Sequence, residues 1–163
     1  MVMKLSWDEV FDRLIGNEGE YSNDPNDPGG ETKWGISKRA YPHLDIKNLT
    51  RDGAKTIYYR DIWIVLDVED LPDSVVFQLF DFAVNSGIQT SIRYFQRALG
   101  VADDGNWGPV SEGAAKIASE SDMIMRLNAE RLDFMTKLKN WPYHGKGWAR
   151  RIAQNLRYGA VDS

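Results

Sequence analysis

Residues 73–87, with the sequence DSVVFQLFDFAVNSG, constrain the fold most, because apolar side chains occupy nearly every face of a helix of this length. A helix that is apolar all round is stable only where other elements surround it. We therefore predict that this segment is the buried central helix of a helical bundle. Its polar residues Asp81 and Asn85 lie four positions apart and share a face. Because buried polar groups need partners, we expect these two residues either to fix the fold or to line a groove.

Helical spacing of apolar residues also runs through most of the remaining chain. We predict helix starts at residues that cap helices or favour their first turn, namely Ser6, Thr50, Asp73, Thr90, Pro109 and Ser121. A last, basic helix is expected after a break at residues 140–147, which contain Pro and Gly. Residues 20–36 lack helical spacing and are rich in Pro and Gly, which predicts a small irregular β-hairpin. The predicted fold class is therefore mainly α, a helical bundle around the buried central helix with one small β-hairpin near the N-terminus.

The length and the cysteine content indicate a domain that folds without disulfide bonds. A chain of 163 residues can bury a core of its own, and this one has no cysteine. The sequence contains no repeat and no linker that would separate two independent domains. We therefore expect a catalytic part, residues 1–90, and a helical part, residues 91–163, packed as one globular unit. We also expect a monomer.

The net charge of −4 is unevenly divided along the chain. Residues 1–90 have 9 Lys or Arg against 16 Asp or Glu, whereas residues 91–163 have 11 against 8. Residues 137–157 hold six Lys or Arg and no acid, which is typical of a solvated helix face and can also hold an anionic partner. We expect transient contact of this 137–157 helix with the anionic cell wall or a membrane surface. The acidic net charge and the lack of a nucleic-acid-binding motif argue against nucleic acid.

The N-terminal sequence MVMKLSWDEVF does not resemble a signal peptide, because no apolar run of sufficient length follows Lys4. No stretch of the sequence is apolar over the length that crosses a membrane. We therefore expect the protein to be made in the cytoplasm, with any export depending on other proteins.

Metal and cofactor chemistry find little support in the sequence. The two histidines, His43 and His144, lie far apart, and no cysteine is present to complete a zinc site. The chain also lacks a G-x-S-x-G nucleophile motif, a phosphate-binding loop and a dinucleotide fingerprint. We predict no metal and no cofactor.

A pair of carboxyl groups between residues 17 and 37 is the strongest chemical signal. Glu18 follows the first predicted helix directly, so it would lie beside the core, where burial raises the pKa of a carboxyl group. In isolation it would be an ordinary surface acid. Asp27 follows nine residues later, with Asp24 as its competitor, and Thr32 comes five residues after Asp27. A protonated carboxyl group with a second carboxylate nearby is the arrangement that cleaves a glycosidic bond.

The same region resembles a known family. Its motifs occur in order and at tight spacing: Glu18-Gly19-Glu20-Tyr21, Asn23-Asp24-Pro25, Asp27-Pro28-Gly29-Gly30-Glu31-Thr32 and Trp34-Gly35-Ile36. They resemble the signature of glycoside hydrolase family 108, muramidases of phage endolysins and bacterial lysis proteins that are named for a Glu-Gly-Gly-Tyr motif. Glu20 departs from that motif and adds a like charge near Glu18. Residues 95–109 resemble the peptidoglycan-binding segment that accompanies this family.

The resemblance implies a lysozyme-like α+β fold and hydrolysis of peptidoglycan glycan strands. It implies that Glu18 is the catalytic acid, which protonates the leaving oxygen between N-acetylmuramic acid and N-acetylglucosamine. The spacing of Asp27 and Thr32 resembles that of phage-type lysozymes, in which the Thr lies slightly further on. Asp27 would stabilise positive charge on the sugar or direct a water that Thr32 holds. Carboxyl groups about 6.5–9.5 Å apart would give inversion, and about 5–5.5 Å would give retention.

Residues that line the sugar groove are expected around these motifs and on the central helix. We predict Tyr21, Trp34, Tyr41 and Asn85 for this role, because aromatic rings suit stacking on sugars and a polar residue of the central helix can face the groove. Core packing is the alternative role for each ring.

Two other functions remain open. One is a non-catalytic peptidoglycan-binding protein on the same scaffold, for which Glu20 would mark a decayed site. The other is a lytic transglycosylase, which uses the same acid without a hydrolytic water, and against which the second carboxylate argues. For an endolysin, the resemblance implies release from the host cytoplasm to the cell wall through a holin pore.

Overall fold

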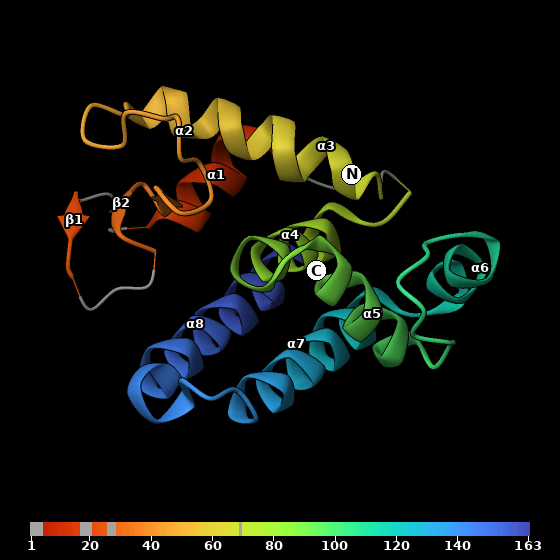
Figure 1. Cartoon of the computed structure of the whole chain (residues 1–163). Helices are drawn as coiled ribbons and strands as arrows, with labels where there is room; N and C mark the ends of the chain where they lie inside the picture. The colour runs from red at the N-terminus through yellow and green to blue at the C-terminus, as the bar shows by residue number, and fades with distance from the viewer. Residues whose placement is uncertain (1–4, 17–20, 26–28, 69) are drawn as a thin grey trace. The chain divides into compact units, whose positions relative to one another are not determined.

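The computed structural model of the protein describes residues 5–16, 21–25, 29–68 and 70–163 (Figure 1). Contacts divide the described chain into two compact units, residues 5–65 and residues 66–163, and each unit is described by itself. None of the described helices is long and apolar enough to cross a membrane. The functional division into residues 1–90 and 91–163 stays a prediction.

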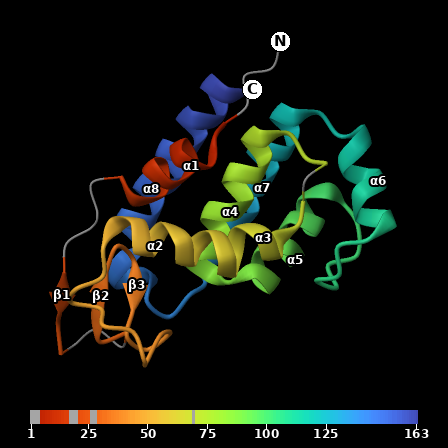
Figure 2. The same cartoon turned by 90° about the horizontal axis from the view of Figure 1, so that it is seen from above.

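The first unit contains three short strands, with helices before and after them in the sequence. Its elements are α1 (Trp7–Ile15), β1 (Ser22–Asn23), β2 (Glu31–Lys33), β3 (Ile36–Ser37), α2 (Arg51–Tyr58), the π-helical turn η1 (Tyr59–Trp63) and α3 (Ile64–Leu66). The helical segments α2, η1 and α3 follow one another without a break, and α3 ends at the first residue of the second unit. The strands form one antiparallel sheet in the order β1–β2–β3 (Figure 2).

Helix α1 begins and ends where the sequence predicts. The hydroxyl oxygen of Ser6 accepts the backbone N–H of Glu9 at 3.1 Å, which satisfies a donor that the helix leaves free. Gly16 ends the helix with a φ of 53°, and its N–H donates to the carbonyl oxygen of Asp12 at 2.9 Å. The side chains buried between these ends are Val10, Phe11, Leu14 and Ile15.

Helix α1 packs against α2 and η1 through aromatic rings and ion pairs. The ring of Phe11 lies 6.0 Å from that of Tyr58, measured between centroids. The indole of Trp7 lies 5.4 Å from Tyr59 and 5.2 Å from Trp63. Ion pairs at the same helices join Arg51 to Asp12 and Lys55 to Asp8. Because exposed ion pairs contribute little to stability, burial of the rings is the main attachment.

A two-residue turn joins β2 to β3. Lys33 pairs with Ile36 across it, and the two residues between them, Trp34 and Gly35, have φ values of 53° and 76°. Positive φ at both central positions is what a type I′ hairpin turn requires. The hydroxyl of Tyr58 donates to the carbonyl oxygen of Trp34 at 2.9 Å, which ties the turn to α2. The small β-element predicted near the N-terminus is thus confirmed and has three strands.

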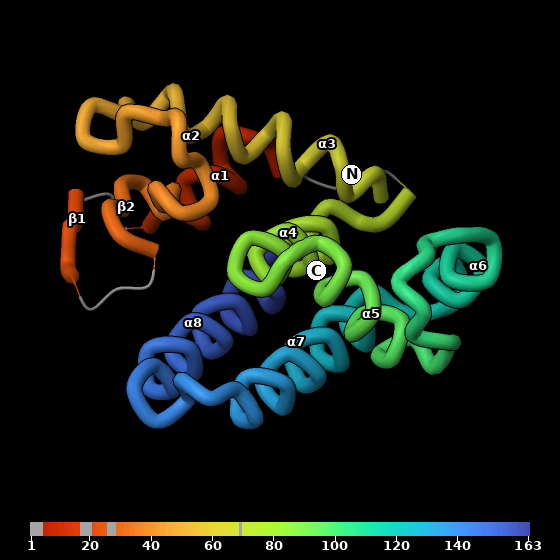
Figure 3. Tube along the Cα trace, viewed as in Figure 1, coloured from red at the N-terminus to blue at the C-terminus, as the bar shows by residue number. Residues whose placement is uncertain are grey.

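The second unit is a helical bundle built around α4. Its elements are α4 (Asp73–Ser86), α5 (Ile88–Leu99), α6 (Pro109–Ile117), α7 (Glu120–Thr136) and α8 (Trp141–Asp162). Helix α4 contacts α5, α7 and α8, and α7 and α8 run side by side (Figure 3). Nine residues of α4 between Ser74 and Ala83 are buried. The prediction of a mainly α fold with a buried central helix is confirmed.

The two polar residues of α4 that were predicted to share a buried face have different surroundings. Asp81 is buried and pairs with Arg131 of α7, whose Nη1 lies 2.7 Å from Oδ2, and with Arg151 of α8. The side-chain amide of Asn155 donates to the same Oδ2 at 2.7 Å. Asn85, one turn later, is exposed. Asp81 therefore joins three helices of the bundle, whereas Asn85 has no such role.

Two helix starts differ from the prediction. Helix α5 begins at Ile88 rather than after Thr90. Helix α7 is capped by Ser119 and not by Ser121, because the hydroxyl of Ser119 accepts the N–H of Asp122 at 3.1 Å. Both serines have the same intrinsic preference for a capping position, so local sequence does not distinguish them.

The prediction of a break at residues 140–147 is wrong, because α8 begins at Trp141. Pro142 lies in the first turn, where its missing N–H loses no helical hydrogen bond. Gly145 allows close packing, since a Cβ there would lie 2.6 Å from the indole of Trp141. The basic segment 137–157 is therefore not one helix, and its first residues precede α8.

Candidate active site

Two of the predicted catalytic residues, Glu18 and Asp27, lie outside the described residues. The structure describes residues 21–25, which lie between them in the sequence and include β1. It also describes β2 and β3, which follow Asp27. The candidate site is therefore built from the described residues of the first unit that belong to the same motifs.

Thr32 lies at the centre of a row of hydroxyl groups. It is in β2, where Ser22 of β1 pairs with it on one side and Ser37 of β3 pairs with it on the other. Residues directly opposite one another in antiparallel strands present their side chains on the same face. Hydroxyl groups can both donate and accept hydrogen bonds. This row therefore suits the predicted role of Thr32, which is to hold a water or a sugar hydroxyl.

Tyr21 is tied to the other face of the sheet. Its hydroxyl donates to Oε2 of Glu31 at 2.6 Å. This hydrogen bond raises the pKa of the Tyr21 phenol. Glu31 precedes Thr32 in β2, so its side chain lies on the opposite face from the hydroxyl row. The exposed ring of Tyr21 is therefore held at the edge of the sheet.

Trp34 is anchored at two points in the β2–β3 turn. Its indole N–H donates to the carbonyl oxygen of Leu49 at 3.1 Å, and its own carbonyl oxygen accepts the hydroxyl of Tyr58. The side chain is half-buried. These contacts fix the position of Trp34, and its role in lining the sugar groove stays a prediction.

Tyr41 forms a polar cluster with two residues of η1. Its hydroxyl donates to Oδ2 of Asp61 at 2.6 Å, and Arg60 donates to the same carboxylate from Nε at 2.7 Å. Burial and the hydrogen bond to Asp61 raise the pKa of Tyr41 to about 12. The hydrogen bonds from Arg60 and Tyr41 lower the pKa of Asp61. At neutral pH this cluster holds a neutral phenol against an ionised carboxylate.

Glu31 and Asp61 are polar partners that the sequence analysis did not select. Glu31 stands inside the motif, but nothing in the sequence indicates that it pairs with a tyrosine ten residues earlier. Asp61 is twenty residues from Tyr41 and lies in a π-helical turn, for which no sequence signal is present. π-helical turns occur frequently at functional sites.

Two other predicted residues have different surroundings. Asp24, the competitor for the second carboxylate, is exposed just after β1. Asn85 belongs to the second unit, which is described by itself. The structure thus places Thr32 in the sheet, with Tyr21 directly before β1, and attaches Trp34 and Tyr41 to the helical segment that follows.

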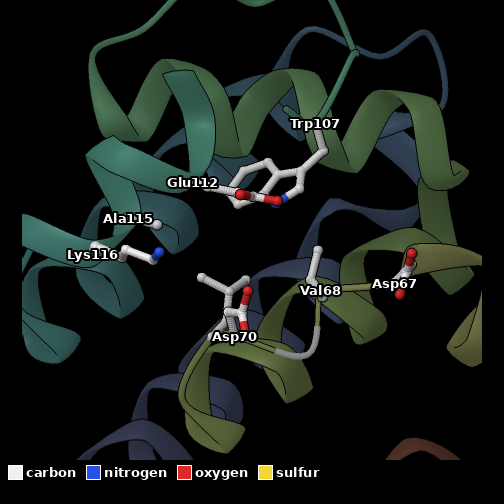
Figure 4. Close-up of a pocket in the computed structure, with 8 residues that line it drawn as sticks. Asp67, Val68, Asp70, Trp107, Glu112, Ala115 and Lys116 are labelled. Carbon is white, nitrogen blue, oxygen red and sulfur yellow. The ribbon is translucent and has the colours of Figure 1, made fainter. Parts of the chain in front are cut away.

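Two cavities of the second unit are lined by none of the predicted site residues. One measures about 30 Å³, and the residues that line it include Trp107, Glu112 and Asp70 (Figure 4). The other measures about 240 Å³ and is lined by residues that include Arg97 and Arg126. Pockets for small-molecule ligands usually measure about 300–1,000 Å³. Both cavities are therefore smaller than a usual small-molecule pocket. Among the residues that the structure describes, no group of three or more His, Cys, Asp or Glu could hold a metal ion.

Two comparisons with known proteins gave matches. Residues 11–87 match the family described as Glycosyl hydrolase 108, a range that includes Glu18, Asp27 and the whole sheet. The chain is also similar to the structure of SagA from Brucella abortus, with 28% sequence identity and a TM-score of 0.87 over 96% of this chain and 95% of that one. A search of curated proteins gave no match. Residues 11–87, just under half of the chain, thus match glycosyl hydrolase family 108, and the fold of the whole chain is similar to that of SagA.

Proposed function

We propose that this protein is a peptidoglycan N-acetylmuramidase, which hydrolyses the β-1,4 bond between N-acetylmuramic acid and N-acetylglucosamine. The observation that carries the proposal is the family match over residues 11–87, because the motif with Glu18, Asp27 and Thr32 lies inside it. Glycoside hydrolases use a pair of carboxyl groups on either side of the bond that breaks. Glu18 and Asp27 supply such a pair.

The roles follow from the chemistry of the bond. Glu18 donates a proton to the leaving oxygen, a step that contributes on the order of 10²–10⁴-fold to the rate. Asp27 stabilises the positive charge that develops on the sugar, or directs a water against it. Thr32 helps to hold that water, and the flanking hydroxyl groups of Ser22 and Ser37 support this role.

Four of the described carboxyl groups make poor alternatives to Glu18 as the acid. A catalytic acid must hold its proton near neutral pH, which requires a raised pKa. Each described carboxyl group whose pKa departs from its ordinary value has a lowered one, because hydrogen bonds or Arg charges stabilise its ionised form. These groups are Asp45, Asp61, Asp81 and Asp103.

The proposal extends to the place of action. The substrate is the glycan strand of the cell wall, and the protein works as a monomer. It is made in the cytoplasm of the host bacterium and reaches the wall through a holin-type pore during lysis. Localisation of a tagged chain before and after co-expression of a holin tests this part.

Digestion of purified peptidoglycan tests the reaction. Wild-type protein, Glu18→Gln and the control Glu9→Gln are incubated with peptidoglycan, and the products are identified by mass spectrometry. Glu9 is a suitable control because it is an exposed carboxyl group in α1, and a Gln there is compatible with the Ser6 cap. We expect reducing N-acetylmuramic acid ends from wild type and from Glu9→Gln, and activity lowered at least a hundredfold in Glu18→Gln. Asp27→Ala should lose less activity than Glu18→Gln.

Each alternative function has its own product. Anhydro-sugar ends would identify a lytic transglycosylase, and free peptides with intact glycan would identify an amidase or peptidase. Strong binding to peptidoglycan without any cleavage would support the non-catalytic protein. A folded Glu18→Gln variant with full activity would exclude Glu18 as the acid.

A further inference from the structure

Helix α8 carries a straight row of basic side chains on its exposed surface. Lys146, Arg150 and Arg157 are all exposed. At about 100° per residue they project within about 40° of one another, and the row is roughly 16 Å long. We call these three residues the basic row. They lie on the side opposite the buried residues of the helix, which are Gly145, Ile152, Asn155 and Gly159.

The structure separates this row from the other basic residues nearby. Arg151 pairs with the buried Asp81 and therefore serves the core of the bundle. Lys137 pairs with Asp133 of α7. Among the described residues, no ion pair is found for any member of the basic row, and the contact of Arg157 is a hydrogen bond of 3.5 Å to the neutral Gln154. The row thus presents three charges without an acidic partner, on a chain whose net charge is −4.

The shape of the surface selects the kind of partner. The outer side of a helix is convex, and neither of the two cavities is lined by a residue of α8. A convex row of long, flexible cations suits a flat and extended anionic surface better than it suits a small ion that must be enclosed. The apolar side of α8 is packed in the bundle, so the helix would lie on such a surface without entering it.

Exposed apolar groups flank the basic row at both ends. Tyr143 is 84% exposed near the start of α8, and Val161 is 80% exposed near its end. Both project within about 60° of Lys146, on the same side of the helix. Tyrosine side chains favour the boundary between water and lipid headgroups, because one end of the ring is apolar and the other is polar. A hydrated polymer of the wall has no such apolar boundary, so Val161 would stay in water there.

We propose that the basic row of α8, with Tyr143 and Val161, docks the protein onto an anionic phospholipid surface. The lipid phosphates pair with the three cations, and the two apolar groups lie at headgroup level. Each Lys or Arg near an anionic bilayer strengthens binding about fivefold, so three of them together contribute roughly a hundredfold. Because salt screens these charges, binding weakens as the ionic strength rises.

Sedimentation of the full chain with lipid vesicles tests the proposal. The vesicles contain phosphatidylcholine alone or phosphatidylcholine mixed with phosphatidylglycerol. The test variant is Lys146→Gln/Arg150→Gln/Arg157→Gln. The control variant, Arg39→Gln/Lys47→Gln/Lys116→Gln, removes the same charge from exposed positions outside α8. Circular dichroism melting curves establish that both variants are folded.

We expect wild type and the control to bind the vesicles that contain phosphatidylglycerol, and this binding should weaken as salt is added. Neither protein should bind vesicles of phosphatidylcholine alone. The test variant should bind roughly a hundredfold more weakly. Equal losses in the two variants, or no binding of wild type to anionic vesicles, would overturn the proposal. Loss of peptidoglycan binding in the test variant, with no vesicle binding by wild type, would identify a wall polymer as the partner instead. Hydrolysis of soluble glycan fragments should be the same for all three proteins, which keeps this proposal separate from the catalytic one.

Discussion

Trp34 holds a backbone conformation that residues with a side chain rarely adopt. Its φ of 53° is required by the two-residue turn between β2 and β3, in which Gly35 has a φ of 76°. A left-handed conformation outside glycine costs about 1–3 kcal/mol and persists where surrounding contacts enforce it. Here the hydrogen bonds to Leu49 and from Tyr58 supply those contacts.

Gly35 should be hard to replace. Gly35→Ala forces an unfavourable φ and brings a Cβ into overlap with the hydroxyl oxygen of Tyr58, so we expect a loss of about 1–3 kcal/mol in the free energy of unfolding. Urea denaturation followed by circular dichroism measures it. Gly113→Ala in α6 is the control, because no atom lies within 4 Å of a Cβ there. In a helix interior this control should gain about 0.5–1 kcal/mol. Equal stability of Gly35→Ala and wild type would contradict this account of the turn.

At the scale of residues, the motif can be recognised from the sequence, whereas the Tyr41–Asp61 pair is visible only in the structure. Glu18, Asp27 and Thr32 were selected because they lie within fifteen residues of one another in a family-like order. Tyr41 and Asp61 form a hydrogen bond of 2.6 Å, but they are twenty residues apart and share no motif. Their contact depends on the path of the chain between β3 and η1.

Among the elements, the sheet shows how register creates a site. Ser22, Thr32 and Ser37 share a face because the pairing places them opposite one another. A shift of one residue in the pairing would turn Thr32 to the other face. The turn at residues 34–35 sets the β2–β3 pairing, so the strained turn and the hydroxyl row depend on each other.

Thr32→Val should separate this role from packing. Valine keeps the shape of threonine and its preference for strands but removes the hydroxyl group. Loss of one positioning hydrogen bond should lower kcat about tenfold, with the unfolding transition unchanged. Thr56→Val in α2 is the control, because Thr56 is exposed and outside the sheet. Peptidoglycan turnover with both variants is the measurement, and wild-type kcat in Thr32→Val would remove Thr32 from the mechanism.

In helix α8, the sequence shows where the basic residues lie along the chain but not which of them are exposed. The run of basic residues at 137–157 was recognised, but the expected break at 140–147 does not occur because Gly145 packs against the ring of Trp141. Which bases are exposed depends on how the helix is rotated in the bundle. That rotation directs Arg151 inward and Arg150 outward, although the two are adjacent.

At the scale of the whole molecule, the second unit is joined by one buried charge network. Asp81 of α4 accepts hydrogen bonds from Arg131 of α7 and from Arg151 and Asn155 of α8. Burial raises the pKa of Asp81, but the charges of the two arginines outweigh it and lower the pKa to about 2. Nε and Nη2 of Arg131 are buried and have no hydrogen-bond partner among the residues that the structure describes. The guanidinium of Arg131 lies 5.3 Å from the ring centroid of Phe82, a cation–π contact that offsets part of this cost.

The pH dependence of unfolding should report on Asp81. Its pKa is about 2 in the folded protein and 3.8 ordinarily, so the folded state stabilises the ionised form. The corresponding stability, about 2 kcal/mol, is fully present above about pH 4 and is lost as the pH falls through 2. Thermal unfolding measured from about pH 6 down to about pH 2 reports this loss.

The variant Asp81→Asn should lose that part of the pH dependence. It should also be less stable at neutral pH by about 3–5 kcal/mol, because it leaves Arg131 without a counter-charge in the core. Asp133→Asn is the control, since the exposed pair of Asp133 with Lys137 contributes at most about 0.5 kcal/mol. An Asp81→Asn variant with the acid sensitivity of wild type would show that other carboxyl groups account for it.

By itself the sequence determined the mainly helical fold, the buried central helix, the β-element and the family motif around Glu18. These features depend on residues a few positions apart, whose spacing and backbone preferences can be read directly. Only the tertiary structure decided that Asp81 has partners 50 to 74 residues away. It also placed Ser22, Thr32 and Ser37 in one row. It further decided which Lys and Arg side chains of α8 are exposed. Such contacts depend on the register of strands and the rotation of helices, which packing of the complete core sets.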